Sequence, residues 1–94
     1  MPRFIVERDC EAVTEEGLLE IRARARIVGE EHFPDIVWKE SRVCANDDGS
    51  FKSFCVYEAP SAERLREHTD WVPGMVLLAV HEIVGELTPD AVQA

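Results

Sequence analysis

The segment from Phe54 to His68 contains most of the side-chain types in this sequence that could carry out chemistry. Cys55 provides a thiol, Tyr57 a phenol, Glu58 a carboxylate and His68 an imidazole. Thiolate, imidazole and carboxylate groups are common ligands of transition-metal ions. The segment is typical of a strand that turns at a proline into a short helix. It therefore predicts a metal site if the fold brings enough of these groups together.

Three side chains outside this segment could complete such a site, namely His32, Glu40 and His81. High-affinity transition-metal sites usually need three or more converging ligands. Simpler interpretations stay open, because a histidine on a buried helix face is commonly a hydrogen-bonded structural residue. Likewise, a lone cysteine in a strand is commonly a small buried hydrophobe, and a glutamate is commonly an ion-pair partner.

The composition describes a small acidic protein. The chain has 94 residues, with 19 Asp and Glu against 10 Lys and Arg, giving a formal charge of −9. This charge repels phosphate backbones and anionic lipids, which argues against a nucleic-acid or membrane partner. No apolar run resembles a membrane span or a signal peptide, and the three cysteines lack a paired spacing. We therefore expect reduced thiols and a cytoplasmic location.

Hydrophobic periodicity and chain-breaking residues divide the sequence into six elements. Pro34 ends the first helix, the Asp-Gly pair at 48–49 is typical of a hairpin turn, and Ser61 is the expected cap of the second helix. The elements form one domain over residues 1–89, followed by a tail over residues 90–94. The predicted elements are a strand 3–8, a helix 14–29 or slightly longer, strands 36–45 and 51–58, a helix 61–72 and a strand 75–87.

The order βαββαβ predicts an α+β, ferredoxin-like fold, with a four-stranded antiparallel sheet and two helices on one face. Alternation along the strands assigns the side chains to the two faces of this sheet. Under the helices we expect Phe4, Val6, Val37, Val43, Phe54, Val56, Val76, Leu78 and Val80. On the open face we expect Ile5, Glu7, Trp38, Glu40, Phe51, Cys55, Tyr57, Leu77, His81 and Ile83. Two such open faces packed together would form a dimeric α/β barrel, which predicts a homodimer. A β-bulge in a strand would reverse the assignment of side chains to the two faces beyond it.

Several motifs support a more specific comparison. They are Pro2-Arg3-Phe4-Ile5-Val6-Glu7-Arg8, then Val37-Trp38 with Ser41, and Phe54-Cys55-Val56-Tyr57-Glu58-Ala59-Pro60 continuing into Arg66-Glu67-His68. With these motifs the chain resembles the DUF4242 family of small bacterial proteins over roughly residues 2–88. The resemblance implies a ferredoxin-like fold. Because the family includes a nickel-binding member, it also implies nickel as a ligand.

Our first functional hypothesis is a non-catalytic nickel-binding protein that sequesters or senses the metal. It follows from the resemblance together with the imidazole, thiol and carboxylate groups described above. The candidate metal ligands are His68, His81, Cys55 and Glu40. No residue is assigned a catalytic role.

The alternative is a small-molecule-binding dimeric α/β-barrel enzyme, similar to small isomerases or monooxygenases. It would use a cavity on the open sheet face, with Trp38 and Tyr57 contacting the cofactor or ligand and His81 beside them. Recognisable enzyme motifs are sparse, since the sequence has no G-x-S-x-G, no phosphate-binding glycine loop and no H-E-x-x-H. A third possibility is a domain whose open face binds a different protein.

Overall fold

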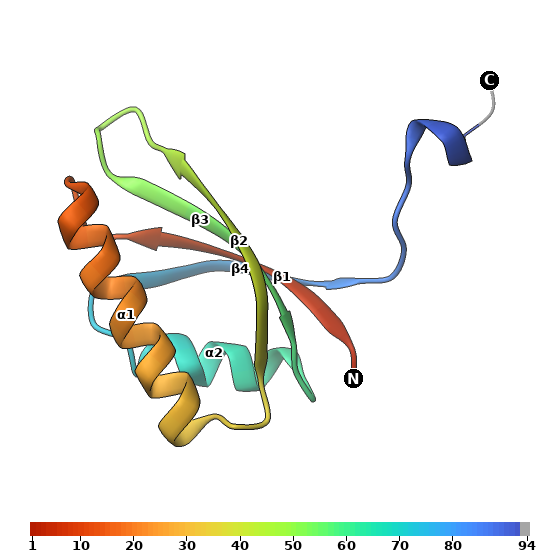
Figure 1. Cartoon of the computed structure of the whole chain (residues 1–94), viewed down its shortest axis with the longest axis horizontal. Helices are drawn as coiled ribbons and strands as arrows, with labels where there is room; N and C mark the ends of the chain where they lie inside the picture. The colour runs from red at the N-terminus through yellow and green to blue at the C-terminus, as the bar shows by residue number, and fades with distance from the viewer. Residues whose placement is uncertain (93–94) are drawn as a thin grey trace.

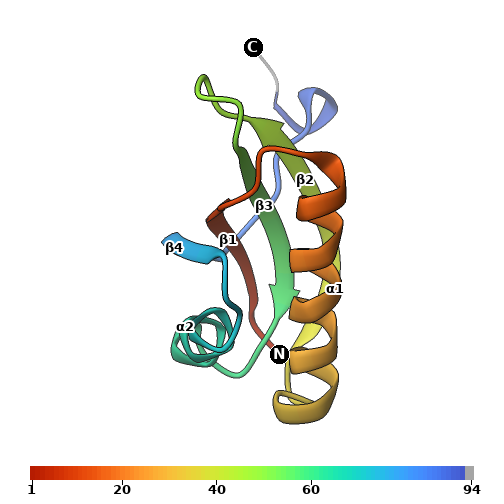
Figure 2. The same ribbon diagram turned by 90° about the vertical axis from the view of Figure 1, so that its left-hand side faces the viewer.

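The computed structural model describes residues 1–92 and confirms the predicted fold (Figure 1). One antiparallel sheet has the strand order β2-β3-β1-β4, and both helices lie on the same side of it (Figure 2). This βαββαβ arrangement is ferredoxin-like. The elements are β1 (Arg3–Cys10), α1 (Glu15–His32), β2 (Val37–Ala45), β3 (Phe51–Glu58), α2 (Ala62–Asp70), β4 (Met75–Ile83) and a 3-10 turn, η1 (Pro89–Ala91).

The first helix, α1, runs past Gly29 to His32, as the predicted range of 14–29 or slightly longer allowed. It begins after Thr14, whose hydroxyl accepts a hydrogen bond from the amide of Gly17 at 3.1 Å. Gly29 does not end the helix. A Cβ at this position would lie 3.6 Å from His68 Nε2, an ordinary van der Waals distance, so the packing does not require glycine here. The helix continues to His32, and the amide of Phe33 donates to the carbonyl of Gly29 at 3.0 Å.

The hydrophobic core lies between the helices and the sheet and consists of two clusters. The first cluster contains Phe4, Val6, Cys55, Tyr57, Ala59 and Leu65, and the second contains Cys10, Leu18, Ala25, Val72 and Met75. The inward side chains of β1 contribute to both clusters, because this strand is central in the sheet. Any polar side chain on the inward face of β1 is therefore enclosed by core.

Strand β3 faces the opposite way from the sequence prediction. Alternation suggested that Phe54 and Val56 lie beneath the helices, yet Cys55 and Tyr57 lie there and are almost fully buried. Tyr57 pairs directly with Phe4 of β1, which also faces the helices. The prediction was wrong because it placed the more hydrophobic pair inside. The tyrosine is instead held inside by a buried polar partner described below.

Two other aromatic residues predicted for the open face also lie on the helix side. Trp38 pairs with Tyr57, and Phe51 pairs with Cys10. A register shift in β2 between Trp38 and Glu40 then returns Glu40 to the open face, where the sequence predicted it. The prediction of the open face is therefore wrong for Trp38 and Phe51 and correct for Glu40.

A second register shift reverses part of β4. Leu77 packs against the core, whereas Val76 and Leu78 are 43% and 44% exposed, the reverse of the predicted pattern. Beyond the shift, His81 pairs with Ile5 and lies on the open face, as predicted. A local bulge therefore explains why strict alternation fails in the first half of the strand.

The C-terminal part of the chain leaves the sheet earlier than predicted. β4 ends at Ile83 rather than at residue 87, and η1 follows after an extended segment (Figure 1). Of the predicted tail over residues 90–94, residues 93 and 94 lie outside the described structure. Over residues 1–92, neither helix has the length and apolar character that would let it cross a membrane.

Candidate functional site

Arg8 is a charged residue that is completely buried beneath the helices, with 0% of its surface exposed. Its Nε donates a hydrogen bond to Thr69 Oγ1 at 2.9 Å, and its Nη1 donates to the Tyr57 hydroxyl at 3.0 Å. Its Nη2 lies 3.3 Å from Nδ1 of His68. Within residues 1–92 no carboxylate forms an ion pair with Arg8. The guanidinium therefore links β1, β3 and α2 while its charge stays uncompensated.

The hydrogen bonds of His68 define its protonation state. Because a guanidinium only donates, Nδ1 of His68 accepts from Arg8, and the ring proton is on Nε2, which donates to the carbonyl of Ala25 at 2.9 Å. Burial lowers the pKa of His68. The hydrogen bond to Ala25 opposes this effect, and the charges of Arg8 and Arg22 lower the pKa further. His68 is thus a neutral imidazole with both nitrogens already engaged.

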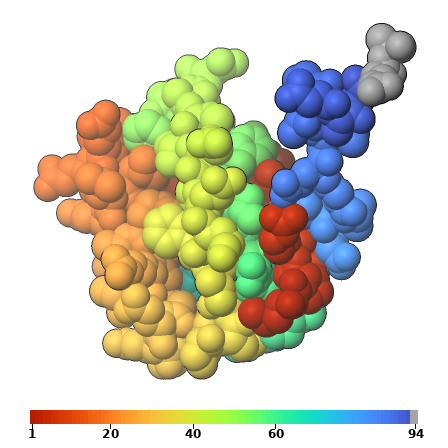
Figure 3. All heavy atoms as spheres, turned by 45° about the vertical axis from the view of Figure 1, so that its right-hand side comes forward, coloured from red at the N-terminus to blue at the C-terminus, as the bar shows by residue number. Residues whose placement is uncertain are grey.

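A pocket of about 430 Å³ opens beside this cluster, between α1 and β2. Figure 3 shows this side of the molecule, where the surface is hollowed between α1 (orange) and β2 (yellow). The volume is within the range of small-molecule sites. Its lining comes from α1, the connection to β2, β2, β3 and α2, and consists of Arg22, Ala25, Arg26, Gly29, Glu30, Pro34, Ile36, Val37, Trp38, Tyr57 and His68.

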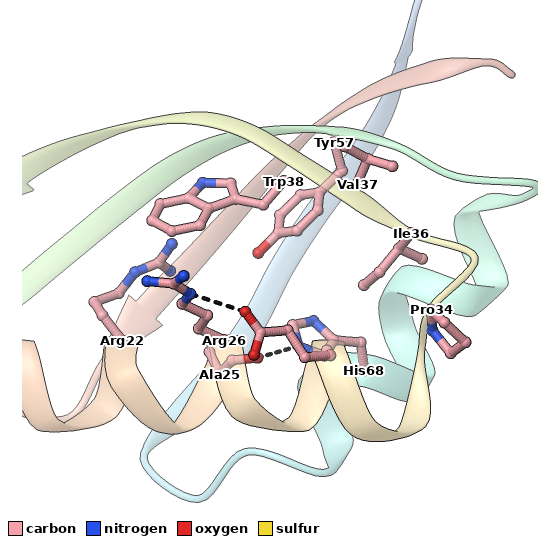
Figure 4. A pocket seen from close by; sticks show the side chains of 11 residues that line it. Arg22, Ala25, Arg26, Pro34, Ile36, Val37, Trp38, Tyr57 and His68 are labelled. Atoms are coloured by element: carbon pink, nitrogen blue, oxygen red, sulfur yellow. Dashed lines mark hydrogen bonds and ion pairs between the residues drawn. The ribbon is translucent and has the colours of Figure 1, made fainter.

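Arg22 of α1 lies at one end of this pocket, under the indole of Trp38 (Figure 4). Its Cζ is 5.1 Å from the centroid of the Trp38 ring, and its Nη2 donates to Ser41 Oγ at 3.0 Å. The same Ser41 oxygen accepts from Trp38 Nε1 at 2.8 Å and donates to Cys55 Sγ at 2.9 Å. The other terminal nitrogen of Arg22, Nη1, is buried and has no hydrogen-bond partner within residues 1–92.

The four predicted metal ligands do not come together in one chain. Cys55 and His68 face the helices, whereas Glu40 and His81 lie on the open face. Glu40 and His81 occupy the same row across the sheet, but two strands lie between theirs, which separates their backbones by about 14 Å. In the described part of the chain, no three His, Cys, Asp or Glu side chains are grouped closely enough to hold a metal ion. A single chain therefore does not fit a nickel site.

Trp38 and Tyr57, the predicted ligand-contacting residues, both line the pocket. The pocket lies on the helix side of the sheet, however, not on the open face where a cavity was predicted, and His81 lies on the other side. The pocket offers hydrogen-bond donors, positive charge and aromatic surface, which suit binding.

Arg8 and Arg22 were not among the sequence candidates. The burial of Arg8 could have been predicted, because every second residue of a strand lies on the same face. Phe4 and Val6 were correctly placed beneath the helices, and Arg8 is the next residue in that series. Arg22 has a weaker signal. Arg22 precedes Ala25 by three residues and Gly29 by seven, so these three residues share one face of the helix. Nothing in the local sequence shows that this face lines a pocket.

Comparison with solved structures supports the fold. The chain is similar to the solution structure of the C-terminal domain of the MgtC protein from Mycobacterium tuberculosis, with a TM-score of 0.60 and 18% identity, over 92% of this chain and 89% of that domain. It is also similar to part of formyltetrahydrofolate deformylase from Burkholderia mallei, with a TM-score of 0.54 and 18% identity, over 87% of this chain and 28% of that chain. At these identities the likeness concerns the fold alone.

The sequence was also compared with curated proteins and with protein-family models. No curated protein matches the chain. A family model does match it over residues 4–84, and its description is nickel-responsive protein, SCO4226-like. Apart from Arg3, the match covers all four strands and both helices of the domain.

Proposed function

The chain belongs to the SCO4226-like family of nickel-responsive proteins, and we propose that it binds nickel itself, as a non-catalytic protein that sequesters or senses the metal. The family match over residues 4–84 is the observation that carries this proposal. It agrees with the resemblance to DUF4242 proteins at the level of small nickel-associated proteins. We further propose a cytoplasmic location, which is supported by Cys10, Cys44 and Cys55 all being free thiols.

We propose that the nickel site is shared by two copies of the chain that pack through their open sheet faces. One copy offers His81 at one edge of this face and Glu40 at the other, too far apart to bind the same ion. A facing sheet related by two-fold symmetry could bring His81 of one copy near Glu40 of the next. Imidazole and carboxylate are suitable donors for nickel(II).

Calorimetric titration of the metal-free protein with Ni²⁺ tests this proposal, with Cu²⁺ and Zn²⁺ titrated alongside because Cu²⁺ generally binds nitrogen sites more tightly. We expect His81→Ala and Glu40→Gln each to weaken nickel binding by about tenfold or more. His68→Gln is the matched control and should bind nickel as the unmodified protein does, because both nitrogens of His68 are engaged inside the fold.

Two results would contradict the proposal. One is nickel binding no tighter than about millimolar, which corresponds to only about 4 kcal/mol. The other is binding that survives the double change His81→Ala and Glu40→Gln. Loss of binding in His68→Gln alone, with the fold intact, would move the site to the helix side of the sheet and overturn the shared-site model.

A further inference from the structure

We propose that the pocket between α1 and β2 binds a small organic carboxylate, which Arg22 and Tyr57 hold by its charged group while Trp38 contacts its apolar part. The pocket lies on the sheet face opposite to His81, so this inference is independent of the proposed nickel site.

Positive charge without a counter-ion is concentrated at this pocket, although the protein as a whole carries a formal charge of −9. Arg22 lines the pocket, and Arg8 lies directly behind its wall, bonded to Tyr57 and His68. Neither arginine forms an ion pair with any carboxylate in the described chain. Burying an unpaired guanidinium is costly, and an anion in the pocket would offset that cost.

Two donors at this pocket have unused hydrogens. Nη1 of Arg22, a lining residue, has no partner among the described residues, and because other side chains cover the atom, Arg22 must shift slightly for an anion to reach it. The Tyr57 hydroxyl accepts its hydrogen bond from Arg8, so its own proton remains available, and Figure 4 shows this hydroxyl pointing into the pocket. A hydroxyl that accepts from a cation becomes a stronger donor. A guanidinium nitrogen and a phenol together match the two oxygens of a carboxylate.

The remaining lining selects a compact ligand with an apolar body. Trp38, Ile36, Val37 and Pro34 provide apolar surface, and the volume of about 430 Å³ suits a molecule of one ring or a short chain. Glu30 also lines the pocket, where it forms an exposed ion pair with Arg26 at 3.0 Å. An exposed ion pair offsets little of the charge, so the Glu30 carboxylate disfavours a second negative charge on the ligand, and we infer a monoanion instead of a phosphate dianion.

Benzoate is a suitable probe, because it combines one carboxylate with one ring. Trp71→Phe leaves Trp38 as the only tryptophan, so its fluorescence reports on the pocket directly. In this background we expect a saturable change in fluorescence on titration with benzoate. Benzamide has the same ring without the charge and should bind about tenfold or more weakly, the usual loss when a charge-assisted hydrogen bond is removed.

Arg22→Gln and Arg24→Gln form a matched pair for the test. Both remove one positive charge from α1, but Arg24 is exposed and does not line the pocket. Arg22→Gln should weaken benzoate binding by about tenfold or more, while Arg24→Gln should change it by less than about twofold. Circular dichroism confirms folding of each variant. If Arg22→Gln fails to fold, Arg22→Lys should still weaken binding, because lysine lacks the planar guanidinium group that can donate two parallel hydrogen bonds to a carboxylate.

Several outcomes would overturn the inference. Absence of saturable benzoate binding would contradict carboxylate binding in this pocket. Equal affinity for benzoate and benzamide would also contradict it. Equal loss in Arg22→Gln and Arg24→Gln would show only a general effect of net charge. Inorganic phosphate serves as the remaining probe, and tighter binding of phosphate than of benzoate would reject a monoanionic carboxylate as the ligand.

Discussion

Arg8 shows how one side chain can organise the interior of this small domain. Its three hydrogen bonds reach Thr69 and His68 of α2 and Tyr57 of β3, so the guanidinium holds the second helix against two central strands. Replacing a partner would leave a buried donor or acceptor unsatisfied, which is more costly than the bond itself is favourable. The cluster therefore explains why Tyr57 faces the core, although the opposite orientation of β3 would have buried the more hydrophobic Phe54 and Val56.

His68 makes the stability of this cluster depend on pH. Its pKa is lowered in the folded protein, chiefly by burial, so the unfolded chain takes up a proton at a higher pH than the folded chain. The free energy of unfolding should therefore be fully retained above about pH 6.5 and fall as pH decreases from there toward the lowered pKa. One such histidine contributes at most about 1.4 kcal/mol per pH unit.

Urea unfolding at several pH values between neutrality and mild acid measures this effect. His68→Gln should lose less stability than the unmodified protein over that range, because it removes the titrating group. His32→Gln, which removes an exposed histidine at the end of α1, is the control for removal of a histidine as such. Equal slopes in the unmodified protein and in His68→Gln would show that His68 does not cause the pH dependence.

At the scale of elements, two glycines form the turns that align the strands. Gly49 and Gly74 have φ angles of +88° and +86°, a region that other residues adopt only with strain. A Cβ at Gly49 would meet open space, whereas a Cβ at Gly74 would lie 3.0 Å from Cδ1 of Ile21 on α1. The first turn is therefore constrained by backbone conformation alone, and the second also by packing.

This difference predicts unequal effects of the same substitution. Gly49→Ala should lower the free energy of unfolding by about 1 kcal/mol, the usual cost of a left-handed conformation for a non-glycine residue. Gly74→Ala should cost about 2 kcal/mol or more, because Ile21 must also move. Urea unfolding of both variants gives the comparison. An equal loss of unfolding free energy in the two variants would mean that Ile21 moves aside without cost and that its contact does not make Gly74→Ala more destabilising.

The sequence was informative about elements and less so about which side of each strand faces the core. Its hairpin signal placed β3 at residues 51–58, the same bounds that the structure has. It failed for the orientation of Cys55 and Tyr57, because hydrophobicity favoured Phe54 and Val56 and the buried partner of Tyr57 lies 49 positions away. Long-range polar partners of this kind leave no local pattern.

The candidate site illustrates the same limit. Trp38 and Tyr57 were identified as ligand-contacting residues and do line a pocket, but on the helix side of the sheet. Their placement depends on a bulge in β2 and on the inward register of β3, and neither follows from the alternation of side chains. Arg22 was missed because its importance comes from its position opposite β2, which only the packing of α1 determines.

At the scale of the whole molecule, the open face of the sheet is the surface without a covering layer. Both helices lie on the other face, and Val76 and Leu78 of β4 are exposed here beside the half-buried Ile5, Phe54 and Val56. Several apolar side chains on an uncovered sheet face are typical of an interaction surface, and here the acidic Glu7 and Asp9 of β1 lie among them. A second copy of the chain is the occupant we propose, because a two-fold axis can place the same patch against itself.

Light scattering coupled to size-exclusion chromatography tests this dimer. The unmodified protein should have twice the mass of one chain, and Leu78→Lys should reduce it to the mass of a single chain, because a lysine buried in an apolar interface is strongly unfavourable. Leu19→Lys is the matched control. Leu19 is also an exposed leucine, at 67%, but it lies on α1, away from the open face, so this variant should remain dimeric. A monomeric unmodified protein at every concentration would contradict both the dimer and the shared nickel site, while leaving the carboxylate pocket unaffected because one chain provides all of its lining.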